Sequence, residues 1–269
     1  MTESSDVRPV ALTIAGSDSG GGAGIQADLK TFHRFGVFGT SAVTAITAQN
    51  TLGVQAIHAV PVDTVRAQID SVVSDLRPAA LKTGMLATAE LAEEVAAAIG
   101  HHGLSRYVMD PVMVATSGDR LLERDAETAL AAELLPLATV VTPNLQEAAI
   151  LTGRPVSTLS DMQAAARSLV DQGAGAALVK GGHLDAEAEA VDVLWDGAEE
   201  HLFRHPWVDT VHTHGTGCTL SAAIAAGLAL GNPLPAAVER AIRYVGHAIA
   251  SAPRLGSGRG PVDHFASPD

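Results

Sequence analysis

The most informative stretch of this chain runs from residue 212 to residue 231 and reads His212-Thr-His-Gly-Thr-Gly-Cys-Thr-Leu-Ser-Ala-Ala-Ile-Ala-Ala-Gly-Leu-Ala-Leu-Gly231. A tight turn at Gly215, Thr216 and Gly217 leads directly into an alanine-rich segment that we predict to be a helix. Free N–H groups at a helix start and the positive end of the helix dipole favour an anion, and glycines let it come close to the backbone. The turn therefore predicts an anion site. A glycine-rich helix start with a small buried cysteine is the alternative.

The only cysteine of the chain, Cys218, lies in this turn. A thiol at a helix N-terminus can have its pKa lowered from roughly 8.5 to about 3.5–7.5. We therefore expect one turn to hold both a phosphate and a base. A single cysteine also excludes an internal disulfide framework and fits a reducing cytosol.

The composition limits the class of protein. The chain has 269 residues, of which 47% are hydrophobic and only 3% aromatic, which suits strands of Ala, Val, Leu and Ile covered on both faces by helices. A net charge of −13 argues against a general nucleic-acid or anionic-membrane surface. No stretch approaches the roughly 20 apolar residues of a membrane span, and no signal peptide is recognisable. We expect a cytoplasmic protein with no nucleic-acid or membrane partner.

Strand and helix patterns alternate along most of the chain. Strands are predicted at 10–15, 41–47, 54–60, 80–84, 107–112, 139–142 and 176–180, and a β-hairpin at 191–204. Helices are predicted at 25–35, 63–75 with Asp63 as cap, 87–99, 125–135, 145–151, 160–172 with Ser160 as cap, 219–230 and 234–250. This order predicts an α/β fold with a mainly parallel central sheet, helices on both faces and a small β-hairpin. We expect a single domain over 1–269, with 1–8 and 253–269 irregular.

The distinctive loops all follow predicted strands or lead into the late helix. They are residues 16–24, 48–51, 82–86, 110–113, 142–147, 180–183 and 215–218. Ligands of parallel α/β sheets bind beyond the carboxyl ends of the strands. We therefore expect these loops to form one site.

The glycine-rich loop from Gly16 to Gly24 resembles a dinucleotide-binding turn. Such turns are followed about twenty positions on by an acidic residue, and the chain has Thr40, Ser41 and Thr44 there instead. It also lacks the Lys-Ser/Thr pair of a P-loop. A Rossmann oxidoreductase is therefore disfavoured.

Several polar residues on the same edge have a chemical and a structural interpretation. Asn144 and Glu147, three apart at a helix start, suit hydrated Mg²⁺, but the same spacing also makes a helix cap. Asp110 follows an apolar strand, where it suits metal or phosphate chemistry or simply a turn. Lys180 and Lys82 close two other strands and serve either an anion or the solvent.

Amide and imidazole side chains complete the candidates. Gln49 and Asn50 follow a strand, and an amide both donates and accepts hydrogen bonds, as an aminopyrimidine ring requires; an ordinary turn is the alternative. His183, His212 and His214 show no zinc-ligand spacing, and we expect no metal role for them.

Seven motifs in order resemble the ribokinase-like superfamily, and within it the hydroxymethylpyrimidine/phosphomethylpyrimidine kinases of thiamine biosynthesis. They are Ala15-Gly-Ser-Asp18 with Gly21-Gly-Ala-Gly-Ile-Gln-Ala-Asp-Leu-Lys-Thr-Phe32, Thr44-Ala-Ile-Thr-Ala-Gln-Asn-Thr51, Lys82-Thr-Gly-Met85, Asp110-Pro-Val-Met113, Thr142-Pro-Asn144 with Glu147, Val179-Lys-Gly-Gly-His183, and His214-Gly-Thr-Gly-Cys-Thr-Leu-Ser221. The sugar kinases of the superfamily usually have Asp where this chain has Cys218, so the thiol favours the vitamin kinases.

The resemblance implies a homodimeric kinase that uses ATP and Mg²⁺ to phosphorylate a hydroxymethylpyrimidine and then its monophosphate. It gives the residues the following roles: Gly215, Thr216, Gly217 and Cys218 around the transferred phosphoryl group, with Cys218 as base; Lys180, Thr216 and Asn144 on the nucleotide; Asp110, Asn144 and Glu147 on Mg²⁺; and Gln49, Gly16, Asp28, Met85 and Val112 around the pyrimidine. Two alternatives are a pyridoxal kinase and a non-catalytic vitamin sensor on the same scaffold.

Overall fold

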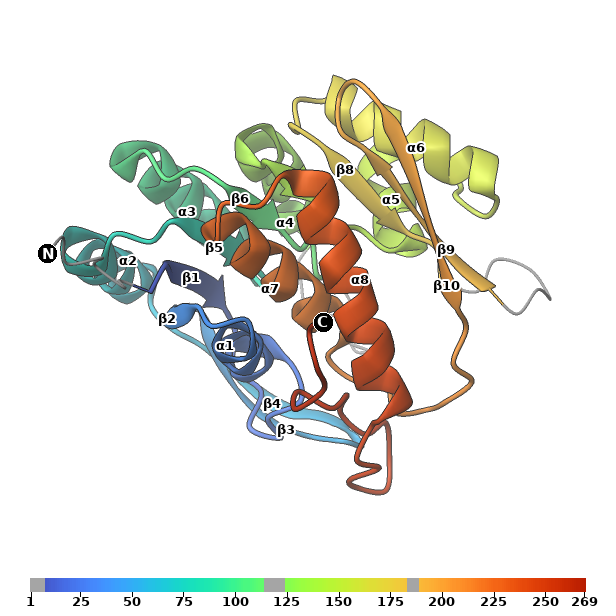
Figure 1. Cartoon of the computed structure of the whole chain (residues 1–269). Helices are drawn as coiled ribbons and strands as arrows, with labels where there is room; N and C mark the ends of the chain where they lie inside the picture. Colours follow the sequence, from blue (N-terminus) through green and yellow to red (C-terminus); the bar gives the residue numbers. More distant parts are fainter. Residues whose placement is uncertain (1–7, 114–123, 183–188) are drawn as a thin grey trace, which may run out of the picture.

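An eight-stranded sheet with the strand order β10-β9-β8-β7-β6-β5-β1-β2 forms the centre of the protein (Figure 1). The computed structural model describes residues 8–113, 124–182 and 189–269, so residues 1–7 of the predicted irregular lead and His183 lie outside the described residues. The strands are β1 (Val10–Ala15), β2 (Phe38–Val43), β5 (Ala80–Thr83), β6 (Tyr107–Met109), β7 (Val140–Val141), β8 (Ala177–Lys180), β9 (Glu189–Trp195) and β10 (Glu200–Pro206).

The sheet is parallel from β2 to β8. The predicted hairpin is confirmed as β9 and β10, which extend the edge of this sheet: β9 pairs antiparallel with β8, and β10 pairs antiparallel with β9. The chain goes from β1 to β2 on one side and later returns to β5 on the other side of β1. Such a reversal of strand order opens a crevice at the carboxyl ends of the two strands, where ligands bind.

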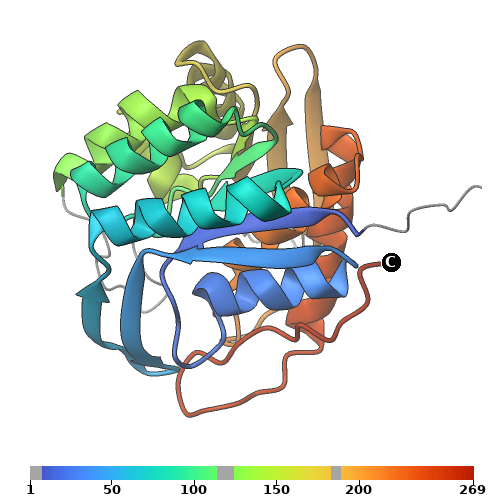
Figure 2. The same cartoon turned by 90° about the vertical axis from the view of Figure 1, so that its left-hand side faces the viewer.

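Helices cover both faces of the sheet, as predicted (Figure 2). They are α1 (Gly24–Arg34), α2 (Val62–Leu76), α3 (Ala89–His102), α4 (Arg124–Ala129), α5 (Leu145–Thr152), α6 (Leu159–Asp171), α7 (Thr216–Ala229) and α8 (Leu234–Ala250), with a π turn (Leu130–Leu134) and a 3-10 turn (Leu135–Leu137) after α4. Successive strand residues point to opposite faces. Tyr107 and Met109 accordingly join the core beneath α2, α3 and α6, whereas Val108 joins the core beneath α1, α7 and α8.

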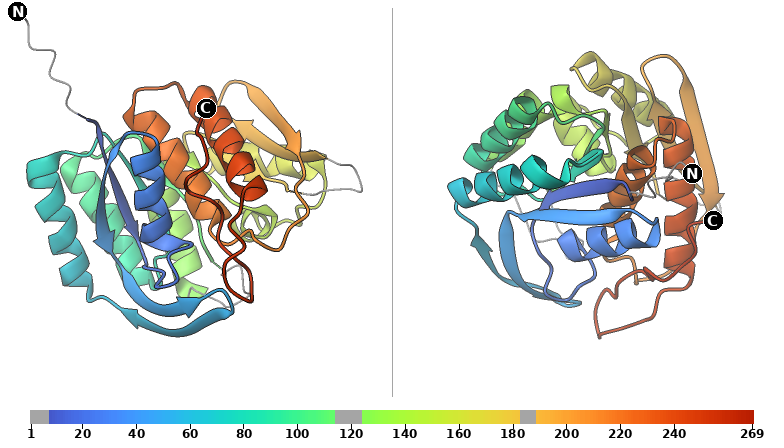
Figure 3. Two further views of the ribbon diagram at one scale, coloured as in Figure 1. Left: turned by 60° about the horizontal axis from the view of Figure 1, so that its bottom comes forward. Right: turned by 60° about the vertical axis from the view of Figure 1, so that its left-hand side comes forward.

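Helix α7 is the most enclosed of the described helices. Every residue from Thr219 to Ala229 is buried, as expected for a helix that is apolar all round. It contacts α1, α8, β1, β5 and β6, and Figure 3 shows it between α1 and α8. A Cβ at Gly227 would lie 2.8 Å from the Cβ of Ala237, so this glycine permits the close approach of α8.

The segment predicted as one strand at 41–47 is two strands in different sheets. The break is at Thr44, which is buried and donates hydrogen bonds from its N–H to Ala15 O (3.0 Å) and from its hydroxyl to Met85 O (2.8 Å). Beyond it, β3 (Ala45–Asn50) pairs antiparallel with β4 (Gly53–Ala59) in a separate two-stranded sheet. The prediction failed because two tertiary hydrogen bonds, which the local pattern does not contain, turn the chain.

Two predicted helix caps are also wrong. Helix α2 is preceded by Pro61, and Asp63 lies in its first turn, where it accepts the N–H of Thr64. Helix α6 is capped by Thr158 and not by Ser160. Thr158 and Asp161 form a reciprocal capping box, which satisfies two backbone donors at once.

The segment after α8 ties distant parts of the chain together without forming a helix or strand. It passes the β3–β4 turn, where the N–H of Arg259 donates to Thr51 O at 2.9 Å. It then reaches His214, whose N–H donates to Gly260 O and whose carbonyl accepts from Val262 N. Within the three described ranges of the chain, no helix is both long and apolar enough to cross a membrane.

We predict an acid-sensitive contribution to stability from His264. This side chain is buried, and its Nε2 lies 3.1 Å from the hydroxyl of Thr219. Burial, helped by the charge of Lys30, lowers the pKa of His264 from 6.5 to about 4. Between these two pH values His264 binds a proton in the unfolded chain but stays neutral in the folded protein, so the free energy of unfolding falls as the pH drops.

The loss should approach about 3 kcal/mol at pH 4, by the conversion of a pKa shift into free energy. Urea unfolding of the wild type and of His264→Gln between pH 4 and 7 measures it, because Gln can keep the bond to Thr219 but does not titrate. Parallel pH dependences of the two proteins would contradict the prediction.

Candidate active site

A cavity of about 430 Å³ lies at the carboxyl ends of β1 and β5, where the strand order reverses. It brings together every predicted site residue except Asp28. These lining residues are Gly16, Gln49, Met85, Asp110, Val112, Asn144, Glu147, Lys180, Gly215, Thr216, Gly217 and Cys218. The predicted convergence of the loops on one edge of the sheet is therefore present in the fold.

The glycine turn opens α7 toward the cavity. Gly215 precedes the helix with a φ of +83°, a conformation that glycine adopts without strain. The N–H of Thr216 donates to Thr213 O at 3.2 Å, whereas an α-helix offers no internal acceptor to the next N–H groups, those of Gly217 and Cys218. A Cβ at Gly217 would lie 3.5 Å from Lys180 Nζ, so the turn and this lysine face each other. The arrangement can hold an anion.

Lys180 and Asp110 form an ion pair beside the turn. Lys180 Nζ lies 3.5 Å from Asp110 Oδ1, and the hydroxyl of Ser221 donates to Asp110 Oδ2 at 3.0 Å. Burial lowers the pKa of Lys180, but the nearby carboxylates of Asp110 and Glu147 outweigh it, so that the pKa is raised. The ammonium group therefore stays charged at neutral pH.

Asn144 and Glu147 form a helix cap at the start of α5, which was the alternative to a role as Mg²⁺ ligands. Asn144 Oδ1 accepts the N–H of Glu147 at 2.9 Å, and Glu147 Oε2 accepts the N–H of Asn144 at 2.8 Å. Burial, assisted by Asp110 and opposed by Lys180, raises the pKa of Glu147 to about 7. Glu147 thus lines the cavity with a carboxyl group that is easily ionised by a nearby cation.

The expectation of an acidic thiol at Cys218 is wrong. Burial, reinforced by the charges of Asp28 and Asp110, raises the pKa of this thiol to about 12. The N–H of Gly24 and the charge of Lys82 act in the opposite direction but do not compensate. The side chain is only partly exposed at the cavity, and reduced contact with water disfavours the charged thiolate.

Asp28 does not line the cavity, contrary to its predicted place in a substrate pocket. It lies beneath the site, where both of its oxygens are 3.2 Å from Lys82 Nζ and Oδ2 accepts the hydroxyl of Thr13 at 2.6 Å. Both charged side chains are fully buried. Lys82 therefore neutralises Asp28 and does not reach a ligand.

Gln49 and Asn50 have different surroundings. Gln49 lines the cavity, and its Oε1 lies 3.2 Å from the hydroxyl oxygen of Thr47. Asn50 is exposed at the β3–β4 turn, where its Oδ1 accepts the N–H of Leu52 at 2.9 Å. The turn interpretation holds for Asn50, and only Gln49 can contact a ligand in the cavity.

Asp18 and His214 were not predicted to have a role in the site, although both line the cavity. Asp18 accepts hydrogen bonds from the N–H groups of Gly20, Gly22 and Ala23 and from His214 Nε2. These glycine-loop N–H groups therefore bind a carboxylate of the protein and not a pyrophosphate. An Asp two residues before a Gly is typical of a side-chain-stabilised turn, and this signal was available in the sequence.

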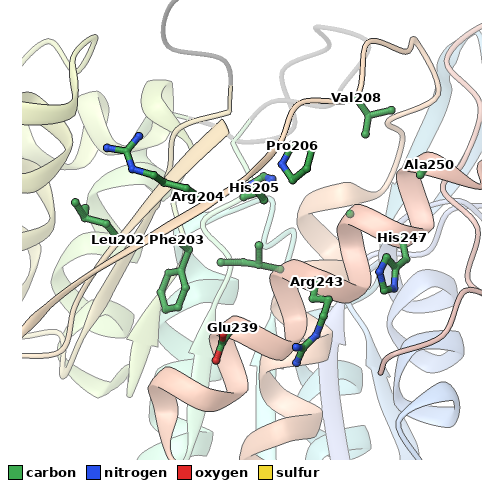
Figure 4. A pocket seen from close by; sticks show the side chains of 12 residues that line it. Leu202, Phe203, Arg204, His205, Pro206, Val208, Glu239, Arg243, His247 and Ala250 are labelled. Atoms are coloured by element: carbon green, nitrogen blue, oxygen red, sulfur yellow. The ribbon is translucent and has the colours of Figure 1, made fainter. Parts of the chain in front are cut away.

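A second cavity, of about 550 Å³, lies between β10 and α8 (Figure 4). Phe203 and His205 of β10 line it, together with Ile242 and Arg243 of α8. No predicted site residue lies there. His205 is paired through Nε2 with Asp192 Oδ2 at 3.1 Å, so it serves the fold of the sheet edge.

The fold and the cavity together define a ribokinase-like small-molecule kinase. Chain residues 18–263 match the family model described as phosphomethylpyrimidine kinase, and the chain therefore belongs to this family. A Rhizobium meliloti protein named hydroxymethylpyrimidine/phosphomethylpyrimidine kinase is 56% identical over 261 residues, covering 95% of this chain and 97% of the relative.

Solved structures agree with this assignment. A phosphomethylpyrimidine kinase from Clostridium difficile is 40% identical, with a TM-score of 0.81 and coverage of 90% of this chain and 100% of that chain. A Bacillus subtilis pyridoxal kinase in complex with ADP is also 40% identical, with a TM-score of 0.90 and coverage of 97% and 98%. The second similarity keeps a pyridoxal kinase as the main alternative for the substrate.

The Gly215 turn should not tolerate a methyl group. A Cβ at Gly215 would overlap the carbonyl oxygen of Gly22 in the first loop. Gly231, at the other end of α7, has nearly the same φ (+84°) but no atom within 4 Å of such a Cβ. Gly231→Ala should cost only the backbone strain of about 1–2 kcal/mol. Gly215→Ala should cost more and should also lower turnover by about 100-fold, since the turn must move.

Chemical unfolding and steady-state turnover of the two variants measure these effects. Equal losses of stability in both variants, with the turnover of Gly215→Ala intact, would contradict the prediction. They would show that the Gly215 turn can move away from Gly22 without loss of stability or activity.

The thiol of Cys218 should react slowly at neutral pH. Because its pKa is raised to about 12, alkylation by iodoacetamide should accelerate about tenfold per pH unit from pH 7 to 10, as the thiolate population grows. Mass spectrometry of the labelled protein gives this rate, and it has no competing thiol because Cys218 is the only cysteine. A rate that is already maximal at pH 7 would mean an acidic thiol after all.

Proposed function

We propose that the protein phosphorylates 4-amino-5-hydroxymethyl-2-methylpyrimidine with ATP, and then phosphorylates the monophosphate to the diphosphate, for thiamine biosynthesis. The observation that carries this proposal is the convergence of the Gly215–Cys218 turn, the Lys180–Asp110 pair and Gln49 on one cavity. The family and the names of its relatives point to the same substrate. Intact anion-binding elements speak against a non-catalytic sensor.

The residues of the cavity suit ATP and Mg²⁺. When bound, ATP supplies the phosphoryl group and Mg²⁺ neutralises its oxygens. Among the described residues, no cluster of three His, Cys, Asp or Glu side chains could hold a metal ion by itself. Mg²⁺ usually keeps waters and phosphate oxygens and takes only one or two carboxylates. Asp110 and Glu147 would supply these carboxylates. The Oδ1 of Asn144 already accepts the N–H of Glu147 in the cap, so Asn144 would position Glu147 and would line the part of the cavity that binds the nucleotide.

The turn would perform the electrostatic part of catalysis. The N–H groups of Gly217 and Cys218 would donate to the oxygens of the transferred phosphoryl group. Thr216 and Lys180 would both contact the nucleotide. Such preorganised donors usually contribute the largest part of catalysis in a water-excluded site. The thiol of Cys218 is a poor base at neutral pH, so we assign its backbone N–H the main role. A loose transition state asks little of a base.

The pyrimidine would lie on the β1–β5 side of the cavity. Gly16 and Met85 are in contact there, because a Cβ at Gly16 would lie 2.6 Å from Met85 Cε. These two residues and Val112 would form the apolar walls, and the amide of Gln49 would pair with the ring edge. Asp28 is left without a direct role in binding.

The remaining expectations concern the protein as a whole. We propose that the chain acts as one domain, since the eight-stranded sheet runs without interruption between its edge strands. We also propose that the protein acts in the cytoplasm. We propose a homodimer, and the two-stranded sheet, whose strand β3 exposes Ile46, is a candidate for its interface.

Steady-state kinetics with hydroxymethylpyrimidine, ATP and Mg²⁺ test the proposed function. The wild type should form the monophosphate and then the diphosphate, and pyridoxal should compete poorly. Gln49→Met should raise KM for the pyrimidine about tenfold, because one hydrogen bond contributes about 1 kcal/mol net and leaves an unpaired partner when removed. Asn50→Asp, which keeps the turn acceptor outside the cavity, should leave KM unchanged.

A large preference for pyridoxal would replace the substrate and keep the kinase. No ATP consumption with either ring would favour the sensor. An unchanged KM in Gln49→Met would remove Gln49 from the binding site.

A further inference from the structure

We propose that Asp18, acting through His214, is a positioning residue that sets the phosphoryl-binding turn against the substrate-binding strand. This inference rests on the proposed function. Asp18 is 2% exposed, and its Oδ2 lies 2.8 Å from His214 Nε2. The two residues are 196 positions apart, and His214 directly precedes Gly215. An ionised carboxylate only accepts, so Nε2 is the donor in this contact.

Asp18 holds the first loop in a fixed shape. Its Oδ1 accepts the N–H of Gly20 at 2.8 Å, and its Oδ2 also accepts the N–H groups of Gly22 and Ala23 at 3.0 and 2.8 Å. Its own N–H donates to Gln26 Oε1 at 2.8 Å. With His214 Nε2, the carboxylate of Asp18 therefore accepts from four donors. Charge-assisted hydrogen bonds of this kind are stronger than neutral ones.

The shaped loop contacts the catalytic turn on one side. The carbonyl of Gly22 lies against Gly215, where only a glycine fits. The backbone of His214 is held from the far side by Gly260 O and Val262 N. The imidazole of His214 therefore joins the first loop to the Gly215 turn. The turn cannot move away from the loop without breaking a hydrogen bond, and it cannot move closer because Gly22 already contacts Gly215.

On its other side the same loop holds the strand that carries Gln49. The hydroxyl of Ser19 donates to Gln49 O and accepts the N–H of Gln49, both at 2.8 Å. The hydroxyl of Thr47 donates to Ser17 O at 2.8 Å. Ser17 and Ser19 flank Asp18, so one short loop sets the distance between the ring-binding amide and the phosphoryl-binding turn.

This arrangement predicts an effect on alignment more than on binding. Reacting atoms must approach to about 3–3.5 Å, and a displacement of about 1 Å can cost 100-fold in rate. The charge of Asp18 is compatible with a neighbouring phosphate, because four hydrogen bonds already compensate it. Burial alone would raise the pKa of Asp18, but its hydrogen bonds to His214 and to the loop N–H groups together outweigh burial, so that the pKa is lowered.

The test compares kcat and KM for both substrates in His214→Ala, His214→Gln, Asp18→Asn and the double variant His214→Ala/Asp18→Asn. His214→Ala should lower kcat about 100-fold and change each KM less than about threefold, as expected for an interaction that serves only the transition state. His214→Gln should restore most of kcat, because its amide can donate to Asp18. Asp18→Asn should lose as much as His214→Ala, and the double variant no more than either.

His201→Ala is the matched control. His201 Nε2 lies 3.0 Å from Asp196 Oδ2 near the β9–β10 turn, outside the cavity, and this variant should keep the wild-type kcat. Thermal unfolding of every variant confirms that it is folded, and His214→Gln supplies a second readout should Asp18→Asn not fold.

Each other outcome overturns the inference. A raised KM for ATP that Gln does not repair would mean that His214 touches the nucleotide itself. Multiplicative losses in the double variant would mean that the two residues act separately, and an unchanged kcat would mean that the contact is only structural. A wild type without turnover on any ring substrate would instead defeat the proposed function, and this inference with it.

Discussion

The structure depends on one constraint: helix α7 must be enclosed by protein along its length and still open at its first turn. Residues Thr219 to Ala229 are all buried, and Gly215 to Cys218 line the cavity. A helix that cannot tilt or fray presents its N–H groups in a fixed direction, which is what electrostatic stabilisation of a transferred group requires. The small side chains of α7 follow from the same constraint, since α1, α8 and three strands all approach it closely.

The buried charges around this helix form two separate layers. Asp28 and Lys82 neutralise each other beneath the turn, whereas Lys180, Asp110 and Glu147 face the cavity. The lower pair has no solvent and no room for a ligand, and a buried pair that has lost one partner is costly. We interpret it as a structural support that keeps a balanced charge near Cys218. The upper group is accessible, and its charges can respond to a bound nucleotide.

Much of the architecture followed from local pattern. The predicted bounds of β1 and α8 coincide with the observed ones, and the predicted loops meet at one cavity. The errors have a common cause in tertiary contacts. Thr44 donates hydrogen bonds to two carbonyls that are distant in sequence, Asp28 pairs with a lysine 54 residues away, and burial raises the pKa of Cys218. In the sequence, Asn144 and Glu147 fitted a helix cap or a metal ligand, and the reciprocal hydrogen bonds identify the cap.

The late position of α7 in the chain has a consequence for biosynthesis. Strands β1, β5 and β6 are complete by residue 109, but α7, which covers one of their faces, ends only at residue 229. During translation that apolar face therefore waits for more than a hundred further residues to leave the ribosome. Non-local closure of this kind slows folding and leaves the nascent chain open to aggregation. Enclosing α7 so completely therefore leaves an apolar face of the sheet uncovered in the growing polypeptide until its last third emerges.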